Sequence, residues 1–95
     1  MNNNLIDIIT RLPAASLYEQ LAEECAELAH DALKLARIIR QENPTPQTKV
    51  ETTQHLIEEL SDVSLVCDVI GIEPDQEIKA RKLQRWAERL EEAGS

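Results

Sequence analysis

Two pairs of carboxylates have the residue types and the spacing to do chemistry. Glu24 and Glu27 are three residues apart, and so are Glu59 and Asp62. Residues three apart lie on one side of an α-helix. Each pair also lies on or beside an apolar stripe of helical period, where a buried seam is expected. The sequence therefore predicts that two helices each direct a pair of acids towards their common seam.

The two acidic pairs are also nearly level with each other if their helices are antiparallel neighbours. Counted outward from helix ends at Gln41 and Gln47, the mean positions of the pairs differ by two residues, or about 3 Å. Carboxylates that meet in a partly dry seam must take up protons or hold cations. A ligand set made only of oxygen favours Mg²⁺ or Mn²⁺, and Mg²⁺ often also binds substrate phosphates. The pattern points towards nucleotide phosphate chemistry.

A group of cations near the carboxyl end of the chain complements these acids. Lys82, Arg85 and Arg89 lie within roughly 60° of one another on a helix of 3.6 residues per turn. Ammonium and guanidinium groups on one face can bind a polyphosphate. The alternative is a solvated face whose cations pair with the neighbouring acids of the same helix.

Three long segments with a helical period must position these residues. They cover residues 15–41, 47–70 and 74–92, and a short helix is expected at residues 5–12. Residues 43–46 contain two prolines and end the first long helix. Either Thr45 or Thr48 can cap the second helix, and Gly71 suits its left-handed end. The apolar positions expected to pack are Leu17, Leu21, Leu28, Leu35 and Ile38; Val50, Ile57, Leu60, Val63, Val66 and Ile70; and Ile78, Leu83, Trp86 and Leu90.

The composition agrees with one all-α domain over residues 1–95, with its core at about 15–92. The chain has no Phe, two Gly and four Pro among 95 residues, which is too few turn residues for a β sandwich or barrel. Short links make consecutive helices antiparallel neighbours in a bundle. Three long helices of so small a chain leave apolar surface uncovered, so we expect homo-oligomerisation, as a homodimer or homotetramer, to complete the bundle.

Charge and cysteine content restrict the class of protein. The net charge of −8 argues against general nucleic-acid binding and against an anionic membrane surface. We find no apolar run long enough to span a membrane and expect no signal peptide. Cys25 and Cys67 lie in helical segments beside apolar residues, so we expect buried, reduced thiols. A cytoplasmic protein follows.

The acidic segments resemble a known signature. Residues 23–27 read EECAE and residues 58–62 read EELSD, which is similar to the EExxE…EExxD pattern of the MazG-like, all-α nucleoside triphosphate pyrophosphohydrolases. Residues 82–90, KLQRWAERL, resemble the final helix of small MazG-like proteins, which carries Lys and Arg. The resemblance covers about residues 15–92, and the spacing between the two half-motifs is slightly long for the family.

The resemblance implies a function. It implies cleavage of a nucleoside triphosphate to the monophosphate and pyrophosphate, as housecleaning of the nucleotide pool. Glu24, Glu27, Glu59 and Asp62 would be the catalytic residues and would hold Mg²⁺, with Mn²⁺ as a substitute. Bound metal polarises phosphates and lowers the pKa of a bound water, and one carboxylate not committed to metal could act as the base. The doubled acids Glu23 and Glu58 point about 100° away and are expected to be supporting or surface residues.

Base recognition stays open at this point. Tyr18 and Trp86 are the only possible aromatic platforms for a base, and for Trp86 a place in the core or a dimer interface is favoured over that role. His55 precedes Glu59 by one helical turn, so it is a candidate for a substrate contact or a solvated side chain. Asp31 either extends the acidic cluster or pairs with a cation.

Two other readings compete with the hydrolase. Residues 27–30 form an ExxH, as in carboxylate-bridged di-iron bundles, but the second helix has ExxD where that chemistry needs another ExxH. The stronger rival is a non-enzymatic acidic module that oligomerises or binds a partner through its helices. Such a module would need no divalent metal and would turn over no triphosphate.

Overall fold

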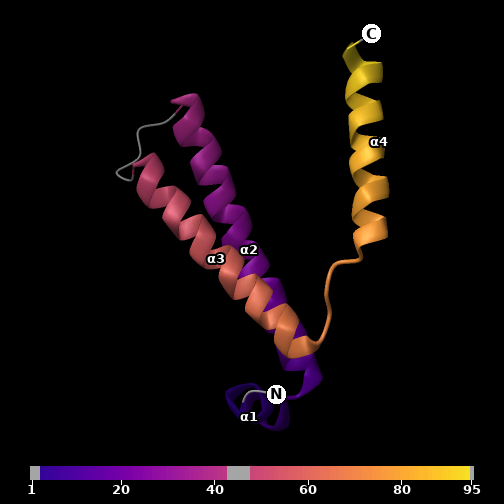
Figure 1. Cartoon of the computed structure of the whole chain (residues 1–95). Coiled ribbons are helices and arrows are strands. Elements are labelled where there is room, and N and C mark those ends of the chain that lie inside the picture. Colours follow the sequence, from indigo (N-terminus) through magenta and orange to yellow (C-terminus); the bar gives the residue numbers. More distant parts are fainter. Residues whose placement is uncertain (1–2, 43–47, 95) are drawn as a thin grey trace.

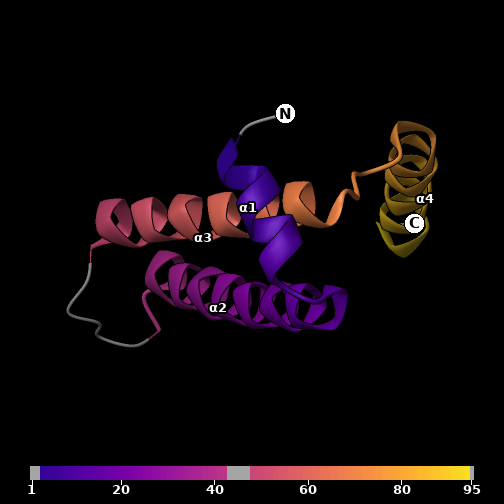
Figure 2. The same cartoon turned by 90° about the horizontal axis from the view of Figure 1, so that it is seen from below.

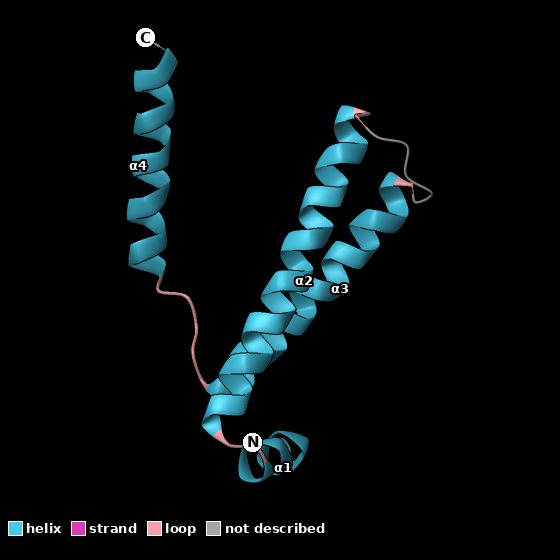
Figure 3. Ribbon diagram, turned by 180° about the vertical axis from the view of Figure 1, so that it is seen from behind, coloured by secondary structure: helices cyan, strands magenta, loops and turns pink. Residues whose placement is uncertain are grey.

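The chain is helical throughout the part that the structure describes. This computed structural model describes residues 3–42 and 48–94, which contain four helices and no strand (Figures 1 and 3). They are α1 (Asn3–Arg11), α2 (Ala14–Arg40), α3 (Lys49–Ile70) and α4 (Gln76–Gly94). The predicted all-α class is confirmed, and each helix lies within two residues of its predicted bounds. Within the same residues, no helix has the length and apolar character needed to cross a membrane.

Local signals set the helix ends. The Thr48 side chain accepts a hydrogen bond of 3.1 Å from the Glu51 backbone N–H, so Thr48 caps α3. Gly71 ends α3 with φ of 89°, a left-handed conformation that favours glycine. Asp75 precedes α4 and accepts a hydrogen bond of 3.0 Å from the Ile78 N–H. The predicted break at residues 43–46, including the cap at Thr45, lies outside the described residues.

Helices α2 and α3 form an antiparallel hairpin (Figures 1 and 3). On α2, the stripe in steps of four and three residues is the packed side, because all its members are buried or half-buried. This result confirms the predicted periodicity and includes the two acids on the stripe. The positions are Leu17, Leu21, Glu24, Leu28, Asp31, Leu35 and Ile38.

The packed side of α3 differs from the predicted one. Val63, Val66 and Ile70 are half-buried as expected, but Val50, Ile57 and Leu60 are exposed, Val50 to 79%. A second stripe faces α2 in their place, again in steps of four and three residues. The rotation places polar groups inside the seam, since two of the members are Thr and Glu. The stripe consists of Thr52, Leu56, Glu59, Val63, Val66 and Ile70.

Helix α4 stands apart from the hairpin. It makes no contact with another described helix, and all its residues are exposed (Figure 2). Leu83, Trp86 and Leu90 are each more than 60% exposed. Helix α1 packs instead across the end of α3 (Figure 2). The three long helices therefore do not complete a bundle within one chain.

The interior of the single chain is small. Leu17 and Val69 are the buried apolar side chains among the described residues, and Thr52 is fully enclosed with no partner for its hydroxyl. Cys25 and Cys67 are free thiols, as expected. The prediction that both are buried is wrong for Cys25, which is exposed, and Cys67 is half-buried.

Candidate carboxylate site

Three of the four predicted carboxylates meet between α2 and α3. Glu24 and Glu27 from α2 and Glu59 from α3 each offer an oxygen atom, and these three atoms lie within 4.8 Å of one another. The antiparallel register brings them together, as the counting from the turn predicted. Two oxygens bound to one Mg²⁺ lie about 3–4 Å apart in octahedral geometry. A small movement of flexible side chains would therefore suffice to bind an ion.

Two oxygen atoms of this cluster lack partners although they are shielded from solvent. The Oε2 atoms of Glu24 and Glu59 are inaccessible and accept no hydrogen bond from the residues that the structure describes. The other oxygen of Glu24 accepts a hydrogen bond of 2.8 Å from Gln20 Nε2. A shielded carboxylate oxygen without a donor is unfavourable unless it binds a proton or a cation. The donor set is thus suited to a hard cation.

The surroundings of Glu59 favour its protonated form. Several causes together raise the pKa of Glu59 from 4.5 to about 7, of which partial burial is the largest and a hydrogen bond with Glu27 the next. The negative charges of Glu27, Asp62 and Glu24 supply the rest of this rise in pKa. The Glu59 carboxylate is therefore half protonated near neutral pH without metal, and a cation would compete with that proton.

The raised pKa predicts how stability depends on pH. Between about pH 4.5 and pH 7 the folded chain holds a proton on Glu59 that the unfolded chain has lost, so stability decreases as the pH rises. Without divalent metal, the melting temperature should fall between about pH 5 and pH 8. This fall should be smaller in Glu59→Gln, which should be the more stable protein at the upper pH. Glu58→Gln, at the exposed neighbouring position, is the control; parallel pH profiles for all three proteins would contradict the prediction.

Asp62 lies beside the cluster and not in it. Its carboxylate is exposed and offers no oxygen to the group of three, yet its charge contributes to the raised pKa of Glu59. The structure therefore brings three of the four predicted carboxylates together, with the fourth beside them.

A hollow of about 330 Å³ adjoins the cluster on one side of the hairpin. The sequence indicates His30 only as part of a di-iron motif, but His30 lines this hollow together with the candidates Asp31 and His55. Its spacing of three residues from Glu27 was the signal that could have identified it. The hollow is lined by Ala26, Glu27, His30, Asp31, His55 and Glu59.

The predicted phosphate-binding cations gather on α4, away from the carboxylates. Lys82, Arg85 and Arg89 line a separate hollow with Trp86. Since α4 does not contact α2 or α3, one chain does not bring these cations to the acids. Tyr18 is exposed on a side of α2 away from the hollow beside the cluster. The three-dimensional arrangement thus places His55 at the carboxylate site, and it leaves Tyr18 and Trp86 away from it.

Comparison with known proteins does not assign the chain to a family. No family model, no curated protein and no solved structure matches it.

Proposed function

We propose that this protein is a Mg²⁺-dependent nucleoside triphosphate pyrophosphohydrolase. The convergence of Glu24, Glu27 and Glu59 across the α2–α3 seam carries the proposal. The resemblance of the acidic segments to the MazG-like signature supports it. The proposed reaction transfers the α-phosphorus to water: a water oxygen forms a bond to it, its bond to the bridging oxygen breaks, and pyrophosphate leaves.

Each carboxylate has a proposed role. Glu24, Glu27 and Glu59 hold Mg²⁺ or Mn²⁺, and the shielded, unpartnered oxygens of Glu24 and Glu59 are donors that fit a hard cation. Bound metal supplies charge for the phosphate oxygens and acidifies water. Asp62, outside the group of three, orients the attacking water and accepts its proton. The hollow lined by His30 and His55 receives the substrate next to the cluster.

The direct test is incubation of the purified protein with each common NTP and dNTP, with and without millimolar Mg²⁺. The proposal expects metal-dependent release of pyrophosphate and the monophosphate from at least one of them. Release of orthophosphate would mean a different bond is cleaved. If no triphosphate is consumed, the hydrolase proposal fails.

The basic side of α4 is proposed to bind the outer phosphates. Lys82→Ala with Arg85→Ala should weaken binding of the triphosphate about tenfold or more, because each charge-assisted hydrogen bond contributes roughly 1.5–3 kcal/mol. The monophosphate, which lacks the outer phosphates, should lose much less affinity. Lys79→Ala with Arg81→Ala removes the same charge outside the Lys82–Arg89 hollow and is the control. The affinities are measured by titration in Mg²⁺. If the triphosphate and the monophosphate lose affinity equally, these cations belong to a solvated face and do not bind the outer phosphates.

A second candidate function has one observation in its favour. The apolar stripe of α4 is unpartnered in the single chain, as expected of a module that works by association. Such a module would be an oligomer with no triphosphate turnover. We propose that the hydrolase is also a homo-oligomer with a dimer as its smallest unit, since the single chain leaves so much apolar surface exposed.

A further inference from the structure

One side of the α2–α3 hairpin carries no charge although the chain has a net charge of −8. This side lies opposite the hollow beside the carboxylates, as the 3.6-residue repeat of both helices places it. Its members are mostly exposed, so no part of the described chain covers it. We call it the open face, defined by Tyr18, Cys25, Ala32, Ile57, Leu60 and Ser64.

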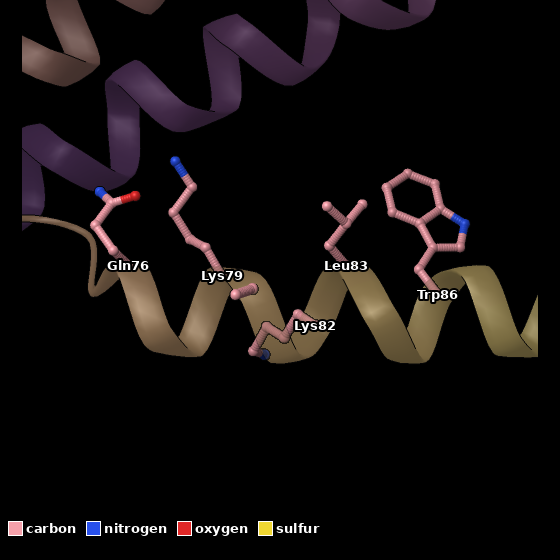
Figure 4. Close-up of a pocket in the computed structure, with 6 residues that line it drawn as sticks. Gln76, Lys79, Lys82, Leu83 and Trp86 are labelled. Atoms are coloured by element: carbon pink, nitrogen blue, oxygen red, sulfur yellow. The ribbon is translucent and has the colours of Figure 1, made fainter.

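Helix α4 has an apolar stripe that is also uncovered. Figure 4 shows Leu83 and Trp86 projecting from one side of α4, with Lys82 pointing to the other side. Leu90 continues the stripe one turn beyond Trp86. The stripe lines a hollow of about 480 Å³ with mainly apolar walls. Exposed apolar patches of this kind mark interaction sites.

The surface area agrees with a missing partner. The chain exposes 7833 Å², whereas a compact monomer of 10.7 kDa exposes roughly 5,500 Å². The excess of roughly 2,300 Å² is larger than the share of about 800 Å² that each partner buries in a standard interface. The radius of gyration of 17.5 Å also exceeds the value of about 12 Å for a compact chain of this length.

Charge selects which surfaces pair. Residues 12–33 and 50–75 contain twelve acids and no Lys or Arg, whereas α4 carries five cations and four acids and so has a net charge of +1. Pairing two hairpins would bring two strongly acidic units together. Docking of α4 on a hairpin instead joins two apolar surfaces without adding negative charge to the hairpin.

The geometry of the chain favours a hairpin from another copy. In its own chain α4 leaves α3 through residues 71–75 and contacts neither helix of the hairpin. The stripe from Leu83 to Leu90 covers about 10 Å, but the open face extends about 21 Å from Tyr18 to Ala32. The open face is therefore long enough to receive the whole stripe, and a twofold axis makes the exchange of α4 between two copies reciprocal.

We propose that α4 of one copy docks through Leu83, Trp86 and Leu90 on the open face of the α2–α3 hairpin of a second copy. The inference rests on the homo-oligomer part of the proposed function and is independent of hydrolysis. The proposal specifies that the partner is a second copy, that the two surfaces are the α4 stripe and the open face, and that α4 is the helix that crosses between chains.

Trp86 is the sole tryptophan, so it reports on α4 directly. The donor chain keeps Trp86 and has both cysteines replaced by serine. The acceptor chain carries Trp86→Phe, the same two serines, and Ser61→Cys labelled with a dye that absorbs tryptophan emission. Ser61 is exposed beside Leu60. The two chains are unfolded together, refolded as a mixture and measured at micromolar concentration.

The proposal expects energy transfer from Trp86 of one chain to the dye on the other, with tryptophan emission at shorter wavelength than after dilution to monomer. Leu83→Asp in the donor should abolish the transfer. Gln84→Asp adds the same charge at the next position, on the polar side of α4, and should preserve it.

Three outcomes would overturn the docking. In a third experiment, a chain that carries both Trp86 and the dye is mixed with an excess of unlabelled chains. If energy transfer persists there, and is absent between two different chains, α4 folds onto its own hairpin. A dimer without transfer would mean that like surfaces pair, and the oligomer would stand while the docking fails. A protein that is monomeric at micromolar concentration would contradict both the homo-oligomer and the docking of α4.

Discussion

Replacing Glu59 with glutamine is expected to lower Mg²⁺-dependent pyrophosphate release by a hundredfold or more. Glu59 is the α3 member of the carboxylate group, and a neutral amide is a poor ligand for a hard cation. Loss of residues that merely support metal ligands already lowers affinity or activity about 10–100-fold, so loss of a ligand should have at least that effect. The measurement is the initial rate of pyrophosphate release with a triphosphate that the wild type consumes.

Glu58→Gln is the matched control for this change. It removes the same charge one residue away, at an exposed position outside the carboxylate group, and should keep nearly the wild-type rate. Mg²⁺ should raise the melting temperature of wild type and Glu58→Gln by mass action, and the rise should be smaller in Glu59→Gln. Equal rates for the two variants would show that the seam carboxylate has no special role.

Asp62→Asn is expected to lower the rate by a factor of 10² to 10⁴, the usual contribution of a general base. The expected difference from Glu59→Gln lies in metal binding. Because Asp62 is outside the group of three oxygens, Asp62→Asn should retain the Mg²⁺-induced rise in melting temperature. Calorimetric titration of Mg²⁺ and the rate assay together separate a base from a ligand. If Asp62→Asn loses metal binding as completely as Glu59→Gln does, Asp62 is a fourth ligand.

The sequence predicted the helices and the meeting of the acids for clear physical reasons. Helix α2 has a single strongly apolar side, and Glu24 lies on that side, so Glu24 had to lie in the seam. A turn fixes the register of an antiparallel hairpin, so Glu27 and Glu59 had to come near each other. These features depend on local periodicity and on counting residues along two rods, which a single sequence contains.

Two features depended on contacts that local patterns do not specify. α3 has apolar residues on two sides, and only packing against α2 determines that Thr52 and Glu59 face inward while Ile57 and Leu60 face outward. α4 has a clear apolar stripe, but periodicity shows only that a stripe needs cover. It does not show which helix provides that cover, so the exposure of Trp86 was not foreseen.

Thr52 and Glu59 lie two turns apart on the same side of α3, and each has a shielded oxygen without a partner. The Thr52 hydroxyl is fully enclosed and uncharged, and it has no hydrogen-bond partner among the described residues, so its desolvation lowers stability. Valine has nearly the same shape and no hydroxyl. Thr52→Val should therefore raise the melting temperature without changing residue 59, so stability and the proposed activity could be altered separately within a single helix.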